Sequence, residues 1–331
     1  MTRILALFAL LLAAACATPP SPSETLSTLP GAYVTPTPPI DPEFSPFLVN
    51  VMLNGEGPFL MLVDTGSSRT ALFDTAAEAL GISTSAETTV LVRGLNSIVE
   101  RPVFKGVDLD LGPFHFEDID LVGLPDREPP RFQGIIGADV LRDLVMVYDA
   151  EQQAMIFIRN EDVPPNTFRR WGEADLIAPP SGNETYGLAF VEANIGSRKV
   201  TALIDSGSAL SVSNWDTALF SIQVRILRNV LRRQWQLDGA NGPFRPRALV
   251  TLETMRIGTF VWQDPQFLLS DLTTLDILGA DTEPFMIIGV DLLGNQSFAF
   301  DLAGERLWFE PSGALRRGDG LTTVYVPLGA R

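Results

Sequence analysis

The sequence predicts an all-β protein built from two homologous β-rich lobes with a few short helices. The chain has 27 glycines and 25 prolines among 331 residues, a composition typical of many short strands and tight turns. Its hydrophobic content of 46% is sufficient for a packed core in each of two domains of ordinary size. A set of motifs also occurs twice in the same order, which indicates an internal duplication.

The first repeated motif is a hydrophobic run that ends in an acid, a hydroxyl residue, a glycine and a serine. It reads Val63-Asp64-Thr65-Gly66-Ser67-Ser68 in the first half and Ile204-Asp205-Ser206-Gly207-Ser208-Ala209 in the second. Aspartate before glycine or serine is common in turns, so each acid alone is also compatible with an ordinary turn residue. Two such turns in matching halves, each after a buried strand, favour a shared function instead.

The second repeated motif is a hydrophobic-hydrophobic-glycine turn followed by a strand pair. The turns are Gly134 to Leu141 and Met286 to Leu293. The predicted strand pairs are Leu144 to Asp149 with Ala154 to Ile158, and Ser297 to Asp301 with Arg306 to Phe309. Ordered repetition of this kind is much more specific than a single motif.

These motifs resemble those of the aspartic proteases over roughly residues 48 to 311. The combination looks like the two-lobed pepsin-type arrangement, with lobes as compact as the bacterial retropepsin-like proteases. The resemblance implies an active site between the lobes, with Asp64 and Asp205 as the catalytic pair. Two carboxyl groups that share a water can activate it and supply a proton without a metal or a cofactor. We expect the pair to titrate as a unit, so neither acid is assigned as the base.

The resemblance also gives roles to the residues around the acids. The hydroxyls of Thr65 and Ser206 would lock the two turns together across the lobe interface. The hydroxyls of Ser67 and Ser208 would donate to the outer carboxylate oxygens, and the hydrophobic-hydrophobic-glycine turns would pack behind the acids. The glycines after the acids, Gly66 and Gly207, would let the backbone turn sharply, so that the carboxylate of one lobe can approach that of the other.

Composition excludes several other classes of function. A formal net charge of −16 argues against a nucleic-acid partner. His115 is the single histidine, so a metal site with several histidines is excluded and a Ser/His/Asp site is disfavoured. We expect His115 to be an ordinary half-buried residue on a strand. Cys16 is the single cysteine, which leaves no intrachain disulfide and no thiol nucleophile in the globular region.

The N-terminal region predicts export. Residues 1–16 read as a signal peptide, and Ala13-Ala14-Ala15-Cys16 resembles a bacterial lipobox, so we expect a lipid anchor on Cys16. Ordinary cleavage beside an incidental cysteine is the alternative. Residues 17–47 are proline-rich and predict an extended tether that packs no core. The protein would then be a periplasmic, membrane-anchored bacterial lipoprotein.

Three segments follow the tether: an N-terminal lobe at 48–160, a linker at 161–184 and a C-terminal lobe at 185–331. Short helices are predicted at Phe73 to Leu80 and at Asn214 to Phe220. Residues 88 to 104 and 234 to 250 each predict two strands about a turn. The turn in the first lobe is Arg93-Gly94-Leu95-Asn96. In the family this hairpin covers the substrate, but here it lacks the tyrosine of the pepsins.

Residues 220–235 differ between the halves and predict an inserted helix. Apolar residues fall at helical spacing, namely Phe220, Val224, Leu227, Leu231 and Trp235, with arginines 225, 228, 232 and 233 beside them. The arginines would be either the solvated side of the helix or a basic face for an anionic membrane or an acidic substrate.

The sequence therefore predicts an aspartic endopeptidase that acts on extended polypeptides and is monomeric in its catalytic unit, because both acids lie on one chain. A peptide-binding lipoprotein on the same scaffold, without hydrolysis, is the first alternative, since a fold does not guarantee a function. A lipoprotein with a structural role in the cell envelope is the second.

Overall fold

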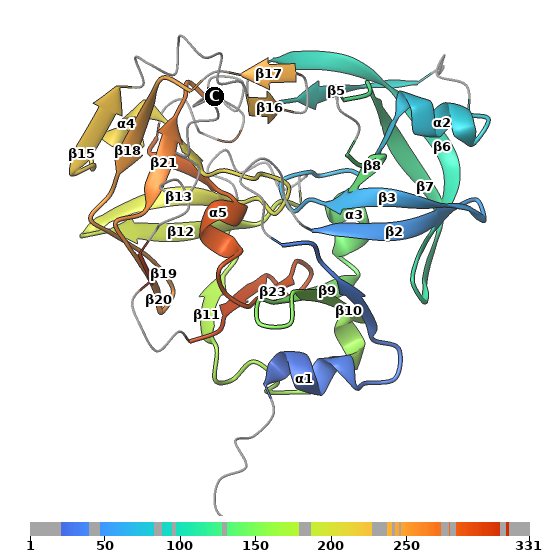
Figure 1. Cartoon of the computed structure of the whole chain (residues 1–331), viewed down its shortest axis with the longest axis horizontal. Helices are drawn as coiled ribbons and strands as arrows, with labels where there is room; N and C mark the ends of the chain where they lie inside the picture. Colours follow the sequence, from blue (N-terminus) through green and yellow to red (C-terminus); the bar gives the residue numbers. More distant parts are fainter. Residues whose placement is uncertain are drawn as a thin grey trace, which may run out of the picture.

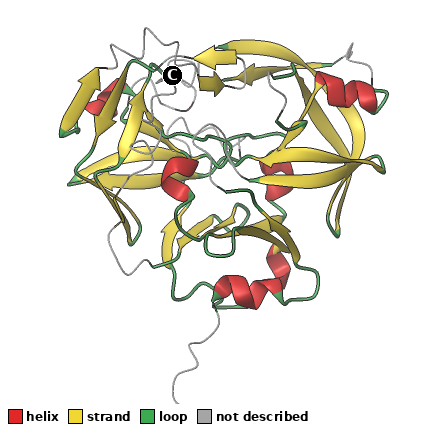
Figure 2. Ribbon diagram, viewed as in Figure 1, coloured by secondary structure: helices red, strands yellow, loops and turns green. Residues whose placement is uncertain are grey.

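The computed structural model describes residues 21–39, 47–82, 88–94, 97–127, 131–178, 187–226, 237–239, 242–244, 246–272, 278, 283–311 and 316–317. Within them the chain forms two β lobes, with a further sheet that joins them at their base (Figures 1 and 2). In Figure 1 the first lobe lies on the right, the second on the left, and the joining sheet lies below them. The predicted fold class, all-β with two lobes and a few short helices, is confirmed.

The first lobe is a single sheet with the strand order β2-β3-β8-β4-β7-β6-β5. Its strands are β2 (Leu48–Leu53), β3 (Glu56–Val63), β4 (Ala71–Phe73), β5 (Thr89–Arg93), β6 (Ile98–Leu111), β7 (Phe114–Leu124) and β8 (Gly134–Ile136). Its helices are α2 (Asp74–Ala79) and α3 (Ala138–Leu141).

The second lobe repeats this order as β12-β13-β22-β14-β21-β18-β15. These strands are β12 (Phe190–Ile195), β13 (Arg198–Ile204), β14 (Val212–Ser213), β15 (Gln223–Ile226), β18 (Ala248–Thr251), β21 (Gln266–Leu269) and β22 (Phe285–Ile288). The same sheet continues through β19 (Thr254–Ile257), β20 (Phe260–Gln263) and β25 (Arg316–Arg317). The lobe also contains α4 (Trp215–Ala218), α5 (Val290–Leu293) and a hairpin of β16 (Leu237–Gly239) with β17 (Gly242–Phe244).

The predicted helix at 220–235 is wrong for its first part. Residues 223–226 form the strand β15, which pairs antiparallel with β18 and is the counterpart of β5 in the first lobe. The sequence Gln-Val-Arg-Ile alternates polar and β-branched residues, a strand pattern that we read as one face of a helix. The remainder of the predicted helix, 227–236, lies outside the described residues.

A six-stranded sheet joins the lobes, in the order β1-β10-β9-β23-β24-β11. Its strands are β1 (Tyr33–Pro36), β9 (Leu144–Asp149), β10 (Ala154–Arg159), β11 (Gly172–Asp175), β23 (Phe298–Asp301) and β24 (Arg306–Phe309). Each lobe contributes its predicted hairpin, β9–β10 or β23–β24. The hairpins meet through β9 and β23, where Val147 lies opposite Ala299. Because these two residues hold equivalent places in the repeats, the lobes are related by an approximate twofold axis at this pair.

The predicted tether is wrong for residues 21–39, because this segment is part of the fold. The helix α1 (Pro22–Ser27) begins at a capping box in which Ser21 and Glu24 bond each other's backbone amides at 3.1 Å and 2.7 Å. Leu26 on α1 is fully buried against the joining sheet. The strand β1 then pairs with β10 at the edge of that sheet. Proline is compatible with the first turn of a helix and with an edge strand, so the proline-rich composition did not exclude this structure.

Three aromatic rings pack where the first lobe meets the joining sheet. The ring of Phe47 lies 4.9 Å from that of Tyr148 and 5.7 Å from that of Phe298, and all three side chains are fully buried. Tyr148 comes from the first half of the chain and Phe298 from the second, so this cluster helps to fix the two lobes relative to each other.

The segment between the lobes contributes the short 3-10 helix η1 (Asn160–Asp162) and the strand β11, which pairs with β24. Part of the predicted linker therefore belongs to the joining sheet. Residues 179–184 of that linker lie outside the described residues. Within the described part of the chain, no helix is both long and apolar enough to cross a lipid bilayer.

Candidate active site

Each acid of the repeated motif lies directly after a buried strand. Val63 at the end of β3 pairs in parallel with Ile136 on β8, and Ile204 at the end of β13 pairs in parallel with Ile288 on β22. The backbone amides of Asp64 and Asp205 each donate at 3.0 Å to the carbonyl of the paired isoleucine. The hydrophobic-hydrophobic-glycine motifs therefore lie directly behind the two acidic turns, as the sequence predicted.

The structure brings the two acidic turns into direct contact. A Cβ on Gly66 would lie 2.5 Å from Cγ of Asp205, and one on Gly207 would lie 2.3 Å from Cγ of Asp64. Neither glycine takes the left-handed conformation. The carboxylate of each lobe nevertheless approaches the turn of the other, as expected from the sequence. The glycines are required because the opposite carboxylate occupies the place of a side chain.

Thr65 and Ser206 lock the turns together, as the resemblance implied. The amide of Thr65 donates to Ser206 Oγ at 3.0 Å, and the amide of Ser206 donates to Thr65 Oγ1 at 3.0 Å. Each hydroxyl in turn donates at 2.8 Å to a carbonyl of the opposite lobe, Thr65 to Ile204 and Ser206 to Val63. Both side chains are buried, so these four hydrogen bonds fix the approach of the acids away from water.

The predicted role of the Ser67 and Ser208 hydroxyls is wrong. Ser67 Oγ donates to the carbonyl of Arg69, and Ser208 Oγ donates to the carbonyl of Leu210, each at 2.8 Å. These bonds close local turns, a geometry that serine commonly adopts. Oxygens of the acids accept from backbone amides instead.

The backbone amides bond one oxygen of each acid. Oδ1 of Asp64 accepts from the amide of Gly66 at 2.8 Å. Oδ1 of Asp205 accepts from the amides of Gly207 and Ser208, both at 2.9 Å. The carboxylates are thus held by the backbone of their own turns, and each is half-buried.

Burial and mutual interaction shift the titration of the pair. Burial raises the pKa of Asp205 well above its usual value, and the charge of Asp64 beside it raises that pKa further. Burial also raises the pKa of Asp64, whereas the hydrogen bond from Asp205 opposes this rise. Two carboxyl groups in contact cannot both ionise readily, so the pair holds one proton over a range of pH.

Arg127 was not anticipated from the sequence. Its positive charge lowers the pKa of Asp64, although less than burial raises it. The guanidinium lies over the rings of Phe73 and Phe132, with Cζ 5.7 Å and 5.6 Å from the ring centroids. Stacking of this kind orients the planar cation in the first lobe. No repeated pattern points to this residue, because the second lobe has no equivalent arginine motif.

A second pair of acids lies behind the turns. Asp139 accepts from the Thr70 hydroxyl at 2.7 Å, and Asp291 accepts from the Ser211 hydroxyl at 2.6 Å. Thr70 and Ser211 stand at the same distance after Asp64 and Asp205 in the sequence. The signal was present, because an aspartate follows the glycine of both hydrophobic-hydrophobic-glycine motifs at the same spacing.

Other predicted residues lie apart from this arrangement or outside the described residues. Arg93 and Gly94 belong to the β5–β6 hairpin, where the amide of Gly94 donates to the carbonyl of Ser97 at 2.9 Å. Leu95, Asn96 and Cys16 lie outside the described residues. The strand pair is as predicted, and a substrate-covering role for the hairpin stays a prediction.

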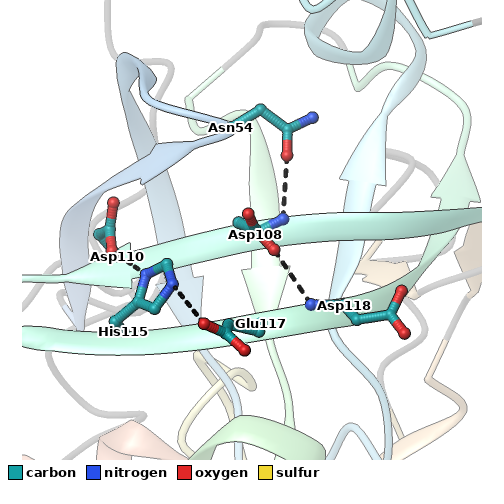
Figure 3. A network of polar contacts seen from close by, with 6 residues as sticks. All are labelled: Asn54, Asp108, Asp110, His115, Glu117 and Asp118. Atoms are coloured by element: carbon teal, nitrogen blue, oxygen red, sulfur yellow. Dashed lines mark hydrogen bonds and ion pairs between the residues drawn. The ribbon is translucent and has the colours of Figure 1, made fainter.

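His115 lies on β7 at the far end of the β6–β7 hairpin (Figure 3). It is an exposed residue, with a side chain that is 50% exposed, whereas we expected it to be half-buried. Nδ1 lies 2.6 Å from Asp110 Oδ1, and Nε2 lies 3.6 Å from Glu117 Oε1. The hydrogen bond to Asp110 raises the pKa of His115. Its partners are surface carboxylates and not the pair Asp64 and Asp205.

The arrangement suits acid–base chemistry on a bound water. Among the residues that the structure describes, no group of three or more His, Cys, Asp or Glu side chains is placed to hold a metal ion. A half-buried carboxyl pair with one shared proton can act as a base toward water and as an acid toward the substrate.

Comparisons with known proteins agree with this geometry. A family model described as aspartyl protease matches residues 49–140 and 191–292, one match in each lobe. The crystal structure of the aspartic proteinase from Irpex lacteus is similar, with 14% sequence identity and a TM-score of 0.50. The similarity covers 86% of this chain and 98% of that one, and at this identity it supports the fold alone. A comparison with curated protein sequences found no match.

Proposed function

The chain belongs to the aspartyl protease family, and we propose that Asp64 and Asp205 together activate the water that hydrolyses a peptide bond. The observation that carries this proposal is the contact between the two acidic turns, where each glycine leaves room for the opposite carboxylate. Structural aspartates on separate turns would not require such an approach. The supporting residues are Thr65 and Ser206, which lock the turns.

In the proposed mechanism, the resting pair carries one proton. Asp205 is favoured as its holder, because the charge of Arg127 favours the ionised form of Asp64. The ionised carboxylate takes a proton from water as the water oxygen attacks the carbonyl carbon of the peptide bond. The protonated partner donates to the carbonyl oxygen, which gives a tetrahedral diol. The pair then gives its proton to the leaving nitrogen as the C–N bond breaks. A hydroxyl of the diol returns a proton to the pair as the new carboxyl group forms, so the pair again holds one proton.

The proposed substrates are extended polypeptides of the cell envelope or the exported fraction. This rests on the predicted signal peptide and lipid attachment at Cys16, from which we infer a location outside the cytoplasm, in the periplasm of a bacterium and anchored to a membrane. A single chain supplies both acids, so the catalytic unit is proposed to be a monomer. A peptide-binding protein on the same scaffold is the alternative, and it predicts binding without turnover.

The test is cleavage of an unfolded protein by the purified chain across a range of pH. Asp64→Asn and Asp205→Asn are each expected to remove nearly all turnover, and the double variant is expected to be little worse than either single variant, because the acids act as one unit. Asp110→Asn, at the His115 surface pair, is the control for a charge change away from the site. Substantial activity in either single variant would reject the shared pair, and binding of peptide without cleavage by the wild type would favour the alternative.

A further inference from the structure

Behind each acidic turn lies an aspartate that the proposed chemistry does not use. Asp139 and Asp291 bond the hydroxyls of Thr70 and Ser211, and each hydroxyl also accepts from a backbone amide. The amide of Gly137 donates to Thr70 Oγ1 at 3.1 Å, and the amide of Gly289 donates to Ser211 Oγ at 2.9 Å. An acid, a hydroxyl and a glycine amide thus form the same chain of hydrogen bonds in both lobes.

In the second lobe this chain is connected to the turn of Asp205. The amide of Val290 donates to the carbonyl of Ser208 at 2.8 Å, and the amide of Asp291 donates to the carbonyl of Ala209 at 3.2 Å. A Cβ on Gly289 would lie 2.7 Å from the carbonyl oxygen of Ser208, so the backbone at Gly289 is in direct contact with the backbone of the Asp205 turn. A shift of Asp291 or Ser211 would therefore move the turn that holds Asp205.

The two copies differ in how the carboxylate is satisfied. Both oxygens of Asp139 accept from the amide of Thr70, at 2.9 Å and 3.0 Å, and Oδ1 also accepts from the amide of Val140 at 3.0 Å. The positive charge of Arg69 also lowers the pKa of Asp139, against the larger effect of burial. The first-lobe acid thus has donors on both oxygens and a nearby cation.

Asp291 has neither advantage. Its Oδ1 accepts from the Ser211 hydroxyl at 2.6 Å and from the amide of Leu292 at 3.0 Å. Its Oδ2 is enclosed and has no hydrogen-bond partner among the described residues. Leu210, a buried side chain, stands where the first lobe has Arg69.

An ionised carboxylate in this place is costly, because it is removed from water and has no counter-charge. Burial raises the pKa of Asp291 to about 6, although hydrogen bonds from Ser211 and Leu292 oppose the rise. The groups that face it from the turn of Asp205 and from α5 are the Ser211 hydroxyl and backbone amides. The largest causes of its shift are burial and hydrogen bonds with Ser211 and backbone amides, and none of these is a charged side chain.

We propose that Asp291 is a positioning residue that works as a neutral acid and makes the turn of Asp205, unlike that of Asp64, sensitive to pH. As the neutral acid, Asp291 accepts the same hydrogen bonds on Oδ1 and carries its proton on Oδ2. When it ionises, the bare Oδ2 needs a donor or water. The required movement is transmitted through Ser211 and Gly289 to Asp205. The part of this proposal that is tested by turnover rests on the proposed function. The part that is tested by unfolding does not.

Asp291→Asn tests this directly, because the amide reproduces the neutral acid at every pH. The pKa of Asp291 is about 6 in the folded chain, against an ordinary value of 3.8, so the acid favours folding below pH 3.8 and this advantage is lost as the pH rises through about 6. In thermal and urea unfolding, the stability of Asp291→Asn relative to the wild type is expected to increase as the pH rises from 3.8 to about 6. Above pH 6 the gain is expected to be about 100-fold in the folding equilibrium constant.

Asp139→Asn is the matched control. Its amide nitrogen replaces an oxygen that accepts from the amide of Thr70, so this variant is expected to lose a hydrogen bond. Because the pKa of Asp139 is raised less than that of Asp291, the stability of Asp139→Asn relative to the wild type is expected to rise less with pH than that of Asp291→Asn. A constant difference between Asp291→Asn and the wild type from pH 4 to pH 8 would overturn the proposal. This measurement stands even if the protein cleaves no peptide, so its outcome is separate from that of the proposed function.

Turnover provides the second measurement, for the positioning role. In kcat/KM against pH, Asp291→Asn is expected to retain activity at higher pH than the wild type, because the turn of Asp205 keeps its geometry. Ser211→Ala, which breaks the chain of hydrogen bonds, is expected to have a lower kcat than the wild type. Ser211→Thr keeps a hydroxyl, as Thr70 does in the first lobe, and is expected to have a kcat close to that of the wild type. Superimposable pH profiles for the wild type and Asp291→Asn would reject the positioning role.

Discussion

Thr65 and Ser206 exchange hydrogen bonds across the lobe interface, each backbone amide donating at 3.0 Å to the hydroxyl of the other residue. Because each hydroxyl also donates to a carbonyl of the opposite lobe, a single side chain satisfies one buried donor and one buried acceptor. The approach of Asp64 and Asp205 therefore depends on two small side chains that are buried in the lobe interface.

Thr65→Val is expected to destabilise the protein and to reduce turnover together. The variant keeps the shape of threonine but leaves the amide of Ser206 and the carbonyl of Ile204 without partners. Each unsatisfied buried group costs about 1–3 kcal/mol in the free energy of unfolding. Urea unfolding and kcat on a model peptide would measure both effects. Thr65→Ser, which retains the hydroxyl, is the control, and equal stability of the Val and Ser variants would contradict this account.

The N-terminal segment gives a second prediction. Leu26 on α1 is fully buried between α1 and the joining sheet, so Leu26→Ala is expected to lower the free energy of unfolding by about 2–5 kcal/mol. Val34→Thr on β1, whose side chain is 44% exposed, is the control and is expected to change it by under about 0.5 kcal/mol. Wild-type stability of Leu26→Ala would indicate that α1 does not dock in solution.

The sequence predicted the parts of the site that are repeated. Asp64 and Asp205 were found because their motifs recur after matching strands, and the same repetition predicted the hairpins of the joining sheet. Residues outside this pattern were missed or misread. Arg127 has no counterpart in the second lobe, and its effect on Asp64 depends on its stacking against Phe73 and Phe132 in the folded structure.

The two errors in secondary structure have the same physical origin. Proline content favoured a tether at residues 21–39, and helical spacing favoured a helix at 223–226, yet both segments contain edge strands. An edge strand is stabilised by pairing with a distant strand, here β10 for β1 and β18 for β15. Local composition carries little information on such pairing. Likewise, the serine hydroxyls at 67 and 208 had several acceptors within reach, and only the folded turns decide among them.

Removal of the charge of Arg127 is expected to shift the pH dependence of activity. Burial raises the pKa of Asp64, and Arg127 partly opposes this, so Arg127→Met should raise that pKa further. The pair then reaches its singly ionised, active form only at higher pH, and the acidic limb of kcat/KM moves upward. Arg198→Met, which removes a guanidinium that lies 4.6 Å from the ring of Phe220 in the second lobe, is the matched control. An unmoved acidic limb in Arg127→Met would exclude this electrostatic role.

The structure also sharpens the anchoring prediction. Only residues 17–20 separate Cys16 from the capping residue Ser21, and a chain of this length spans at most about 17 Å. A lipid on Cys16 would thus hold α1 near the membrane surface. Cys16→Ser is expected to move the protein from the membrane fraction to the soluble exported fraction, with Thr18→Ser as the control. Unchanged fractionation of Cys16→Ser would indicate a membrane contact elsewhere on the protein.

A peptide analogue with a non-cleavable hydroxyl in place of the scissile carbonyl distinguishes an enzyme from a binding module. That hydroxyl would lie where the attacking water lies and would resemble the tetrahedral intermediate, so it should bind between Asp64 and Asp205. Asp205→Asn is expected to weaken its binding by about 10- to 150-fold, because a hydrogen bond to a charged group is worth about 1.5–3 kcal/mol.

The same peptide with a methylene in place of the hydroxyl is the control, and it should bind the wild type and Asp205→Asn with equal affinity. Calorimetry would measure all four affinities. The β5–β6 hairpin, which is predicted to cover the substrate, presents Leu91 and Ile98, 64% and 43% exposed, so the peptide part is expected to bind through aliphatic contacts in every case. If the hydroxyl analogue binds wild type and Asp205→Asn with equal affinity, the carboxyl pair does not recognise the transition state, and peptide binding without hydrolysis replaces the proposed enzyme.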